Sequence, residues 1–99
     1  MPYDIHHDDG TSHVRLAGTL TFAAHRKFRS VVTRLESQSP GRVVLDLSRV
    51  EHIDAAGLGL LLVARDTVRT KGGQAELHGA SGQVGRMLHL ARFTDLFHA

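Results

Sequence analysis

The chain has 99 residues, of which 41% are hydrophobic, and this is enough for one ordinary domain with a single core. It contains no cysteine, which excludes disulfides and thiolate metal sites. Twelve basic against ten acidic residues leave a net charge of +2, and the five aromatic residues include no tryptophan, so no stacking platform for nucleic acid is evident. The longest apolar run, residues 58–64, is too short to cross a bilayer.

The N-terminal part of the chain predicts a pair of strands. Alternating apolar and polar residues indicate a strand over residues 13–17 and a less distinct one over residues 3–7, joined by a turn at Asp8-Asp9-Gly10. Residues 18–21 break the alternation. The first ten residues show no basic region followed by an apolar run, so we expect no signal peptide and a cytoplasmic protein.

A helix and a buried strand are predicted next. Apolar residues at helical spacing place the helix over residues 22–36, with Thr21 as its N-cap and residues 37–41 as its stop signal. The run Arg-Val-Val-Leu-Asp-Leu at residues 42–47 is almost continuously apolar. Such a run is typical of a central strand that is covered on both faces.

The second half of the chain repeats helix, strand and helix. We predict a helix over residues 55–69, a strand over residues 75–78 and a last helix over residues 82–91 with Ser81 as its N-cap. Because the strands at 42–47 and 75–78 flank a helix, they should be parallel. The residues expected to cover the end of the sheet are Phe93, Leu96 and Phe97.

Asp54 stands between an expected loop, residues 48–53, and a leucine-rich helix. Its carboxylate can accept the free backbone N–H of Ala56 or Gly57, a cap that stabilises by about 1 kcal/mol. A phosphate on residue 55 would meet the positive end of the helix dipole and unpaired N–H donors. Ala55 and Ala56, however, have no oxygen to carry one. Gly57 would permit either close approach of a partner backbone or tight packing of the helix on the sheet.

The segment VVLDLSRVEHIDAAGLGLLLVARD, residues 43–66, resembles the STAS domain of bacterial anti-sigma factor antagonists. That family has a strand ending in an Asp-Leu-Ser-like turn, a short loop, and then Asp-Ser-Ser-Gly-Leu or Asp-Ser-Ala-Gly-Leu at the start of a helix. The resemblance extends from about Val14 to Phe97. It implies an α/β fold in which residues 1–99 form one STAS domain, with a mixed four- to five-stranded sheet and three main helices packed against it.

The resemblance also implies that the protein acts by binding another protein. Such domains dock onto an anti-sigma factor, often a serine kinase, and release the sigma factor that it holds. The kinase phosphorylates the serine after the aspartate, and a PP2C-type phosphatase removes the phosphate. That serine corresponds to Ala55, so the phosphorylation site is lost, either in a natural variant or through an engineered serine-to-alanine substitution. We expect a monomer or weak dimer.

The expected partner surface combines residues 54–58 at the start of the second helix, the loop at residues 18–22 and the exposed face of the second helix. Many relatives have an acidic residue at the position of Thr21, and its absence here puts the partner's identity in question. Thr19 and Thr21 are also alternative hydroxyl targets. The predicted partner-binding residues are Thr19, Thr21, Asp54, Ala55, Ala56, Gly57, Leu58, Arg65 and Arg69.

Two functions of other classes compete with the antagonist. One is a STAS adaptor subunit of an ABC-type lipid transport system or another signalling scaffold, and the other is a ligand sensor that uses a cavity at the sheet end. Residues 6–9, His-His-Asp-Asp, could form a metal patch, but a solvated turn is favoured. Ser48 and His52 lack the third member and oxyanion loop of a hydrolase. We therefore expect no cofactor, no metal and no catalysis.

Overall fold

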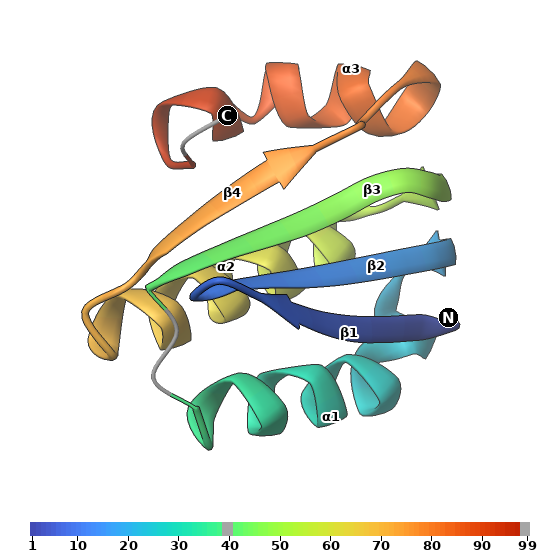
Figure 1. The fold of residues 1–99 in the computed structure, drawn as a ribbon. Coiled ribbons are helices and arrows are strands. Elements are labelled where there is room, and N and C mark those ends of the chain that lie inside the picture. Colours follow the sequence, from blue (N-terminus) through green and yellow to red (C-terminus); the bar gives the residue numbers. More distant parts are fainter. Residues whose placement is uncertain (39–40, 98–99) are drawn as a thin grey trace.

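Strands and helices alternate in the predicted order β-β-α-β-α-β-α (Figure 1). The structure is a computed structural model that describes residues 1–38 and 41–97. In chain order the elements are β1 (Tyr3–Asp8), β2 (Thr11–Leu20), the 3-10 turn η1 (Phe22–Ala24), α1 (His25–Glu36), β3 (Arg42–Ile53), α2 (Ala55–Thr70), β4 (Gln74–His78), α3 (Gly82–Leu90) and the 3-10 turn η2 (Phe93–Asp95).

The strands form one mixed sheet in the order β1-β2-β3-β4. The pair β1–β2 is antiparallel and is joined by Asp9 and Gly10, whose φ angles of 49° and 78° are those of a primed hairpin turn. The pairs β2–β3 and β3–β4 are parallel, because α1 and α2 cross over between them. The turn and the parallel pairing of residues 42–47 with 75–78 are thus confirmed.

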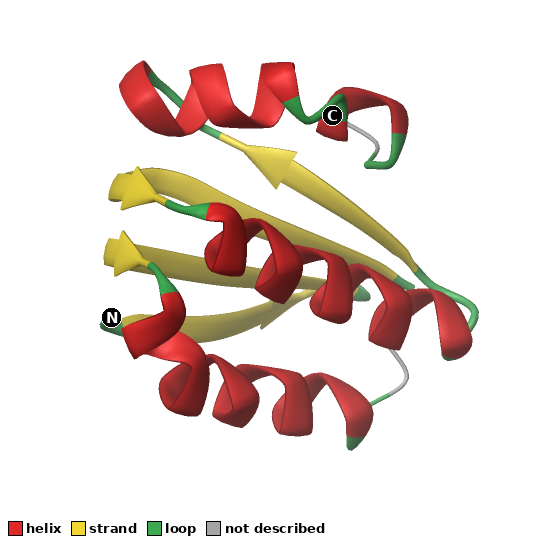
Figure 2. Cartoon of the chain, turned by 180° about the vertical axis from the view of Figure 1, so that it is seen from behind, coloured by secondary structure: helices red, strands yellow, loops and turns green. Residues whose placement is uncertain are grey.

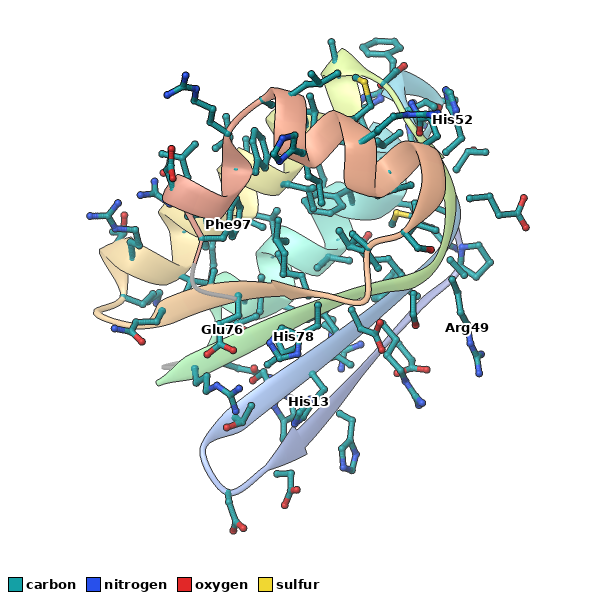
Figure 3. The ribbon with its side chains drawn as sticks, turned by 90° about the horizontal axis from the view of Figure 1, so that it is seen from above. His13, Arg49, His52, Glu76, His78 and Phe97 are labelled. Atoms are coloured by element: carbon teal, nitrogen blue, oxygen red, sulfur yellow. The ribbon has the colours of Figure 1, made fainter. Side chains whose placement is uncertain are left out.

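The helices pack on one face of the sheet (Figures 2 and 3). Alternate residues of the strands point toward them and form a single core with the apolar stripes of the helices. Fully or almost fully buried members of this core include Val14, Leu16, Phe28, Val43, Leu45, Leu47, Leu61 and Val84. No helix in the described part of the chain has both the length and the apolar character needed to cross a membrane.

The helices cover only one face of β3, although the residue pattern predicts a strand that is covered on both faces. Val44 points away from the helices, and it is nevertheless only 4% exposed. Its neighbours in the sheet register are His13 and Glu76, and it lines a shallow pocket on this face together with His13 and His78. The continuous apolar run therefore reflects a central position in the sheet, and the outer face is otherwise polar.

Both central strands are longer than predicted. β2 continues through Leu20 although Gly18 has a positive φ of 81°, and β3 continues through Ile53. The expected strand break at 18–21 and the expected loop at 48–53 are therefore wrong. The two segments pair with each other, from Ala17↔Arg49 to Leu20↔Ile53, across two register shifts. This pairing extends beyond the end of β4, so local sequence patterns do not reveal it.

Two predicted caps and one predicted burial are also corrected. Thr21 and Ser81 occupy N-cap positions, but neither side chain donates or accepts a capping hydrogen bond. Phe93 and Phe97 are buried and their rings stack at 5.5 Å, as expected of residues that cover the sheet end. Leu96, between them, is 40% exposed and is not part of that cover.

Candidate functional site

The ends of β2 and β3 place two turns side by side. Because the strands are parallel, their last residues Leu20 and Ile53 are in register, and the chain leaves both at the same edge of the sheet. The N–H of Asp54 donates to the carbonyl of Leu20 at 3.4 Å. The turn before α1 and the start of α2 therefore form one surface, which Figure 2 shows at the edge where β2 and β3 end. We call this the α2-start surface: residues 19–22 and 54–58.

Asp54 caps α2 as predicted. Its backbone is extended, with φ of −116°, and its Oδ1 accepts the N–H of Gly57 at 2.8 Å. The carbonyl of Asp54 accepts the N–H of Leu58 at 3.0 Å. The carboxylate therefore satisfies one of the free N–H donors at the beginning of this 16-residue helix.

The amide groups of Ala55 and Ala56 have no hydrogen-bond acceptor among the described residues. Ala55 is exposed and Ala56 is partly exposed. Both N–H groups lie at the positive end of the α2 dipole, where a negative charge is stabilised. The geometry at position 55 is thus open to solvent and favourable to an anion, and the side chain that occupies it is a methyl group.

Gly57 serves the packing of α2 rather than contact with a partner. It is buried, and a Cβ atom built on it would lie 1.9 Å from the carbonyl oxygen of Leu20 and 2.7 Å from Cγ1 of Ile53. Of the two roles considered for this glycine, the structure shows close packing of the helix on the sheet. Gly57 therefore fixes how near the start of α2 approaches the end of β2.

Arg65 and Arg69 do not join the α2-start surface. At 1.5 Å per residue they lie about 15 Å and 21 Å further along the helix than Ala55. The Nε of Arg65 donates to the carbonyl of Leu96 at 2.6 Å, and both arginines line a separate pocket of 440 Å³ together with Asp95. The predicted partner residues therefore form two groups, one at each end of α2.

Thr19, Thr21 and Leu58 do lie with Asp54, and Phe22 at the end of the predicted segment 18–22 lies with them. Thr19 is exposed opposite His52 of β3, and Thr21 and Leu58 are partly exposed. Phe22 is 70% exposed and its ring stacks on His25 at 5.0 Å. The predicted surface includes this segment, but the residue pattern does not show that its phenylalanine is exposed, because burial depends on tertiary packing.

The strongest charge interactions lie elsewhere, on the outer face of the sheet (Figure 3). Glu76 accepts two hydrogen bonds from the guanidinium of Arg42 and one from His78 at 2.9 Å. The hydrogen bonds from Arg42 lower the pKa of Glu76 to about 2, although burial opposes this shift. At Asp46, burial acts to raise the pKa, but hydrogen bonds from Ser48 outweigh it and the pKa is lowered.

The histidine cluster at residues 6–9 is divided by the strand. His7 Nδ1 bonds to the Oγ of Ser12 at 2.9 Å, whereas the ring of His6 lies 6.3 Å from that of His13. Successive strand residues point to opposite faces, so neighbours in sequence are separated in space. Within residues 1–38 and 41–97, no group of three or more His, Cys, Asp or Glu side chains is placed to hold a metal ion.

Comparison with known proteins assigns this architecture to a family. The sequence matches the STAS domain over residues 3–99. The chain is a member of the STAS-domain family. It is 32% identical over 84 residues to a STAS-domain-containing protein of Pseudomonas aeruginosa, and the match covers 85% of this chain and 82% of the relative.

Two groups of solved structures share the fold. The unphosphorylated anti-sigma factor antagonist SpoIIAA superposes with a TM-score of 0.80 at 17% identity, over 97% of this chain and 85% of that one. SpoIIAA of Bacillus is also solved in its phosphorylated form, with a TM-score of 0.73 at 17% identity over 97% of this chain and 88% of that one. A sulfate transporter family protein from Wolinella succinogenes superposes with a TM-score of 0.75 at 22% identity, over 90% and 72% of the two chains.

Proposed function

We propose that this STAS domain is an anti-sigma factor antagonist that works in the cytoplasm by binding and not by catalysis. One observation carries the proposal: α2 begins with two free amide donors and an exposed residue 55, at the position where the family has its phosphorylated serine. The fold match to SpoIIAA, which is solved in unphosphorylated and phosphorylated forms, supports it. The domain acts as a monomer or weak dimer. Its partner is an anti-sigma factor, either with or without serine kinase activity.

Ala55 makes the proposed antagonist permanently active. A phosphate on residue 55 would add about 1.5 to 2 negative charges beside the free amides of α2. These charges would change both the local potential and the space available to a partner. A methyl group cannot accept a phosphate, so a kinase could not switch this surface off through residue 55, and a PP2C-type phosphatase would have no substrate there.

The test is binding of each anti-sigma factor of the source organism to the wild type, Ala55→Ser and Ala55→Asp, measured by calorimetry. We expect one anti-sigma factor to bind the wild type and Ala55→Ser equally and Ala55→Asp at least tenfold more weakly, since one charged group near an interface is worth about 1.4 kcal/mol or more. Gln74→Glu is the matched control, because it adds the same charge at an exposed residue at the beginning of β4. Equal affinity for all four proteins would refute the switch.

A second candidate is a STAS adaptor of a transport system, such as an ABC-type lipid transporter. The fold match to a sulfate transporter family protein favours it. The separate basic pocket with Arg65 and Arg69 gives this candidate a surface of its own. Capture of a transporter ATPase from the same organism, weakened by Arg69→Ala but not by Ala55→Asp, would support the adaptor and contradict the antagonist.

A further inference from the structure

The end of β3 is held on its second side by a side chain and not by a strand. β4 pairs with β3 only as far as His78↔Asp46, so the backbone of Ile53 has a strand neighbour on the β2 side alone. On the other side, Oε1 of Gln83 accepts the N–H of Ile53 at 3.0 Å, and Nε2 of Gln83 donates to the carbonyl of Ile53 at 2.8 Å. One carboxamide thus makes both hydrogen bonds that an adjacent strand would exchange with one residue.

Loss of these two hydrogen bonds would leave buried backbone groups without a partner. Ile53 is fully buried, so its N–H and carbonyl have no water to replace the bonds from Gln83. A buried polar group left without a partner costs about 1–3 kcal/mol. Gln83 is itself partly buried in the first turn of α3, 30 residues further along the chain.

The residues that follow Ile53 are those of the α2-start surface. Asp54, which caps α2, is the next residue, and Ala55 is the one after it. With Leu20 on one side and Gln83 on the other, the backbone that leads into α2 is fixed in direction as well as in position. Two parallel hydrogen bonds restrict rotation about the strand end, which a single bond would allow.

We infer that Gln83 is the positioning residue of the α2-start surface and that it ties the beginning of α3 to the beginning of α2. The carboxamide holds Ile53 so that Asp54 reaches the N–H of Gly57 and Ala55 stays exposed. This role follows from the contacts of Ile53 and does not depend on which protein binds the surface. It extends the functional unit to α3, which contributes no residue of its own to that surface.

Amide exchange and methyl resonances of the whole chain test this inference by nuclear magnetic resonance, without any partner. In Gln83→Ala, we expect the protection of the Ile53 and Gly57 amides to fall about tenfold or more, in line with the loss of a buried hydrogen bond. The methyl resonances of Ala55 and Ala56 should shift. The amide of Leu45, in the middle of β3, should change much less.

Two further variants separate positioning from general stability. Gln83→Glu keeps an acceptor for the N–H of Ile53 but loses the donor for its carbonyl, so it should retain part of the Ile53 protection. Arg86→Ala removes an exposed side chain from the same helix and should leave Ile53 unchanged. If Gln83→Ala lowers the protection of Leu45 and Ile53 equally, or leaves the Ala55 methyl unmoved, Gln83 is not a positioning residue. Failure of the antagonist proposal would alter none of these results.

Discussion

The contact between Gly57 and β2 predicts opposite effects for two glycine-to-alanine changes in the same helix. A Cβ on Gly57 would lie 1.9 Å from the carbonyl oxygen of Leu20, whereas a Cβ on Gly59 meets nothing within 4 Å. Ordinary van der Waals contact begins at 3.4 Å, so Gly57→Ala must increase the distance between α2 and β2 by about 1.5 Å. The carbonyl of Leu20 cannot turn away easily, because it accepts the N–H of Asp54.

The magnitudes follow from these contacts. Alanine is favoured over glycine inside a helix by about 1 kcal/mol, and Gly59→Ala should gain most of it. Gly57→Ala gains the same propensity but adds an overpacking cost of about 3 kcal/mol, the upper end for buried sites, so its net loss should be about 2 kcal/mol. For a domain of this size, 1 kcal/mol corresponds to about 4–8 °C in the melting temperature.

Urea denaturation followed by circular dichroism measures both variants against the wild type. We expect the unfolding midpoint to fall for Gly57→Ala and to rise for Gly59→Ala, with similar slopes in all three proteins. A rise of similar size for both variants would show that the start of α2 does not press against the end of β2. The packing argument for the α2-start surface would then be wrong.

Three further outcomes are expected. Asp54→Ala should lower the free energy of unfolding by about 1 kcal/mol in urea denaturation, because it removes the cap on Gly57, while Asp54→Asn should cost much less. Ala55→Asp should raise stability by about 0.3–1 kcal/mol, because its charge meets the positive end of α2; a melting temperature below that of the wild type would contradict this. The lowered pKa of Glu76 stabilises the folded state above pH 4.5, and this contribution is lost as the pH falls toward 2. Acid unfolding should therefore begin at a higher pH in Arg42→Gln than in the wild type, and identical acid transitions would refute the role of this ion pair.

The sequence alone determined the order of elements and the cap at the start of α2. Periodicity is a local property, so the helices at 25–36 and 55–70 and the strand between them could be predicted from neighbouring residues. The cap at Asp54 is equally local, since its acceptor and donor are three residues apart. For this reason the residue pattern is sufficient to place position 55 at the start of a helix.

Only the tertiary structure decided where strands end and which residues share a surface. The second halves of β2 and β3 have weak local patterns and are strands because they pair with each other. The hydrogen bonds between Gln83 and Ile53 join residues that are 30 positions apart, and the sequence pattern of neither segment predicts them. Only the structure shows that Arg65 contacts the carbonyl of Leu96 and lies about 15 Å along the axis of α2 from Ala55. Local sequence fixes how each segment is shaped, but hydrogen bonds and packing between distant segments fix where they meet.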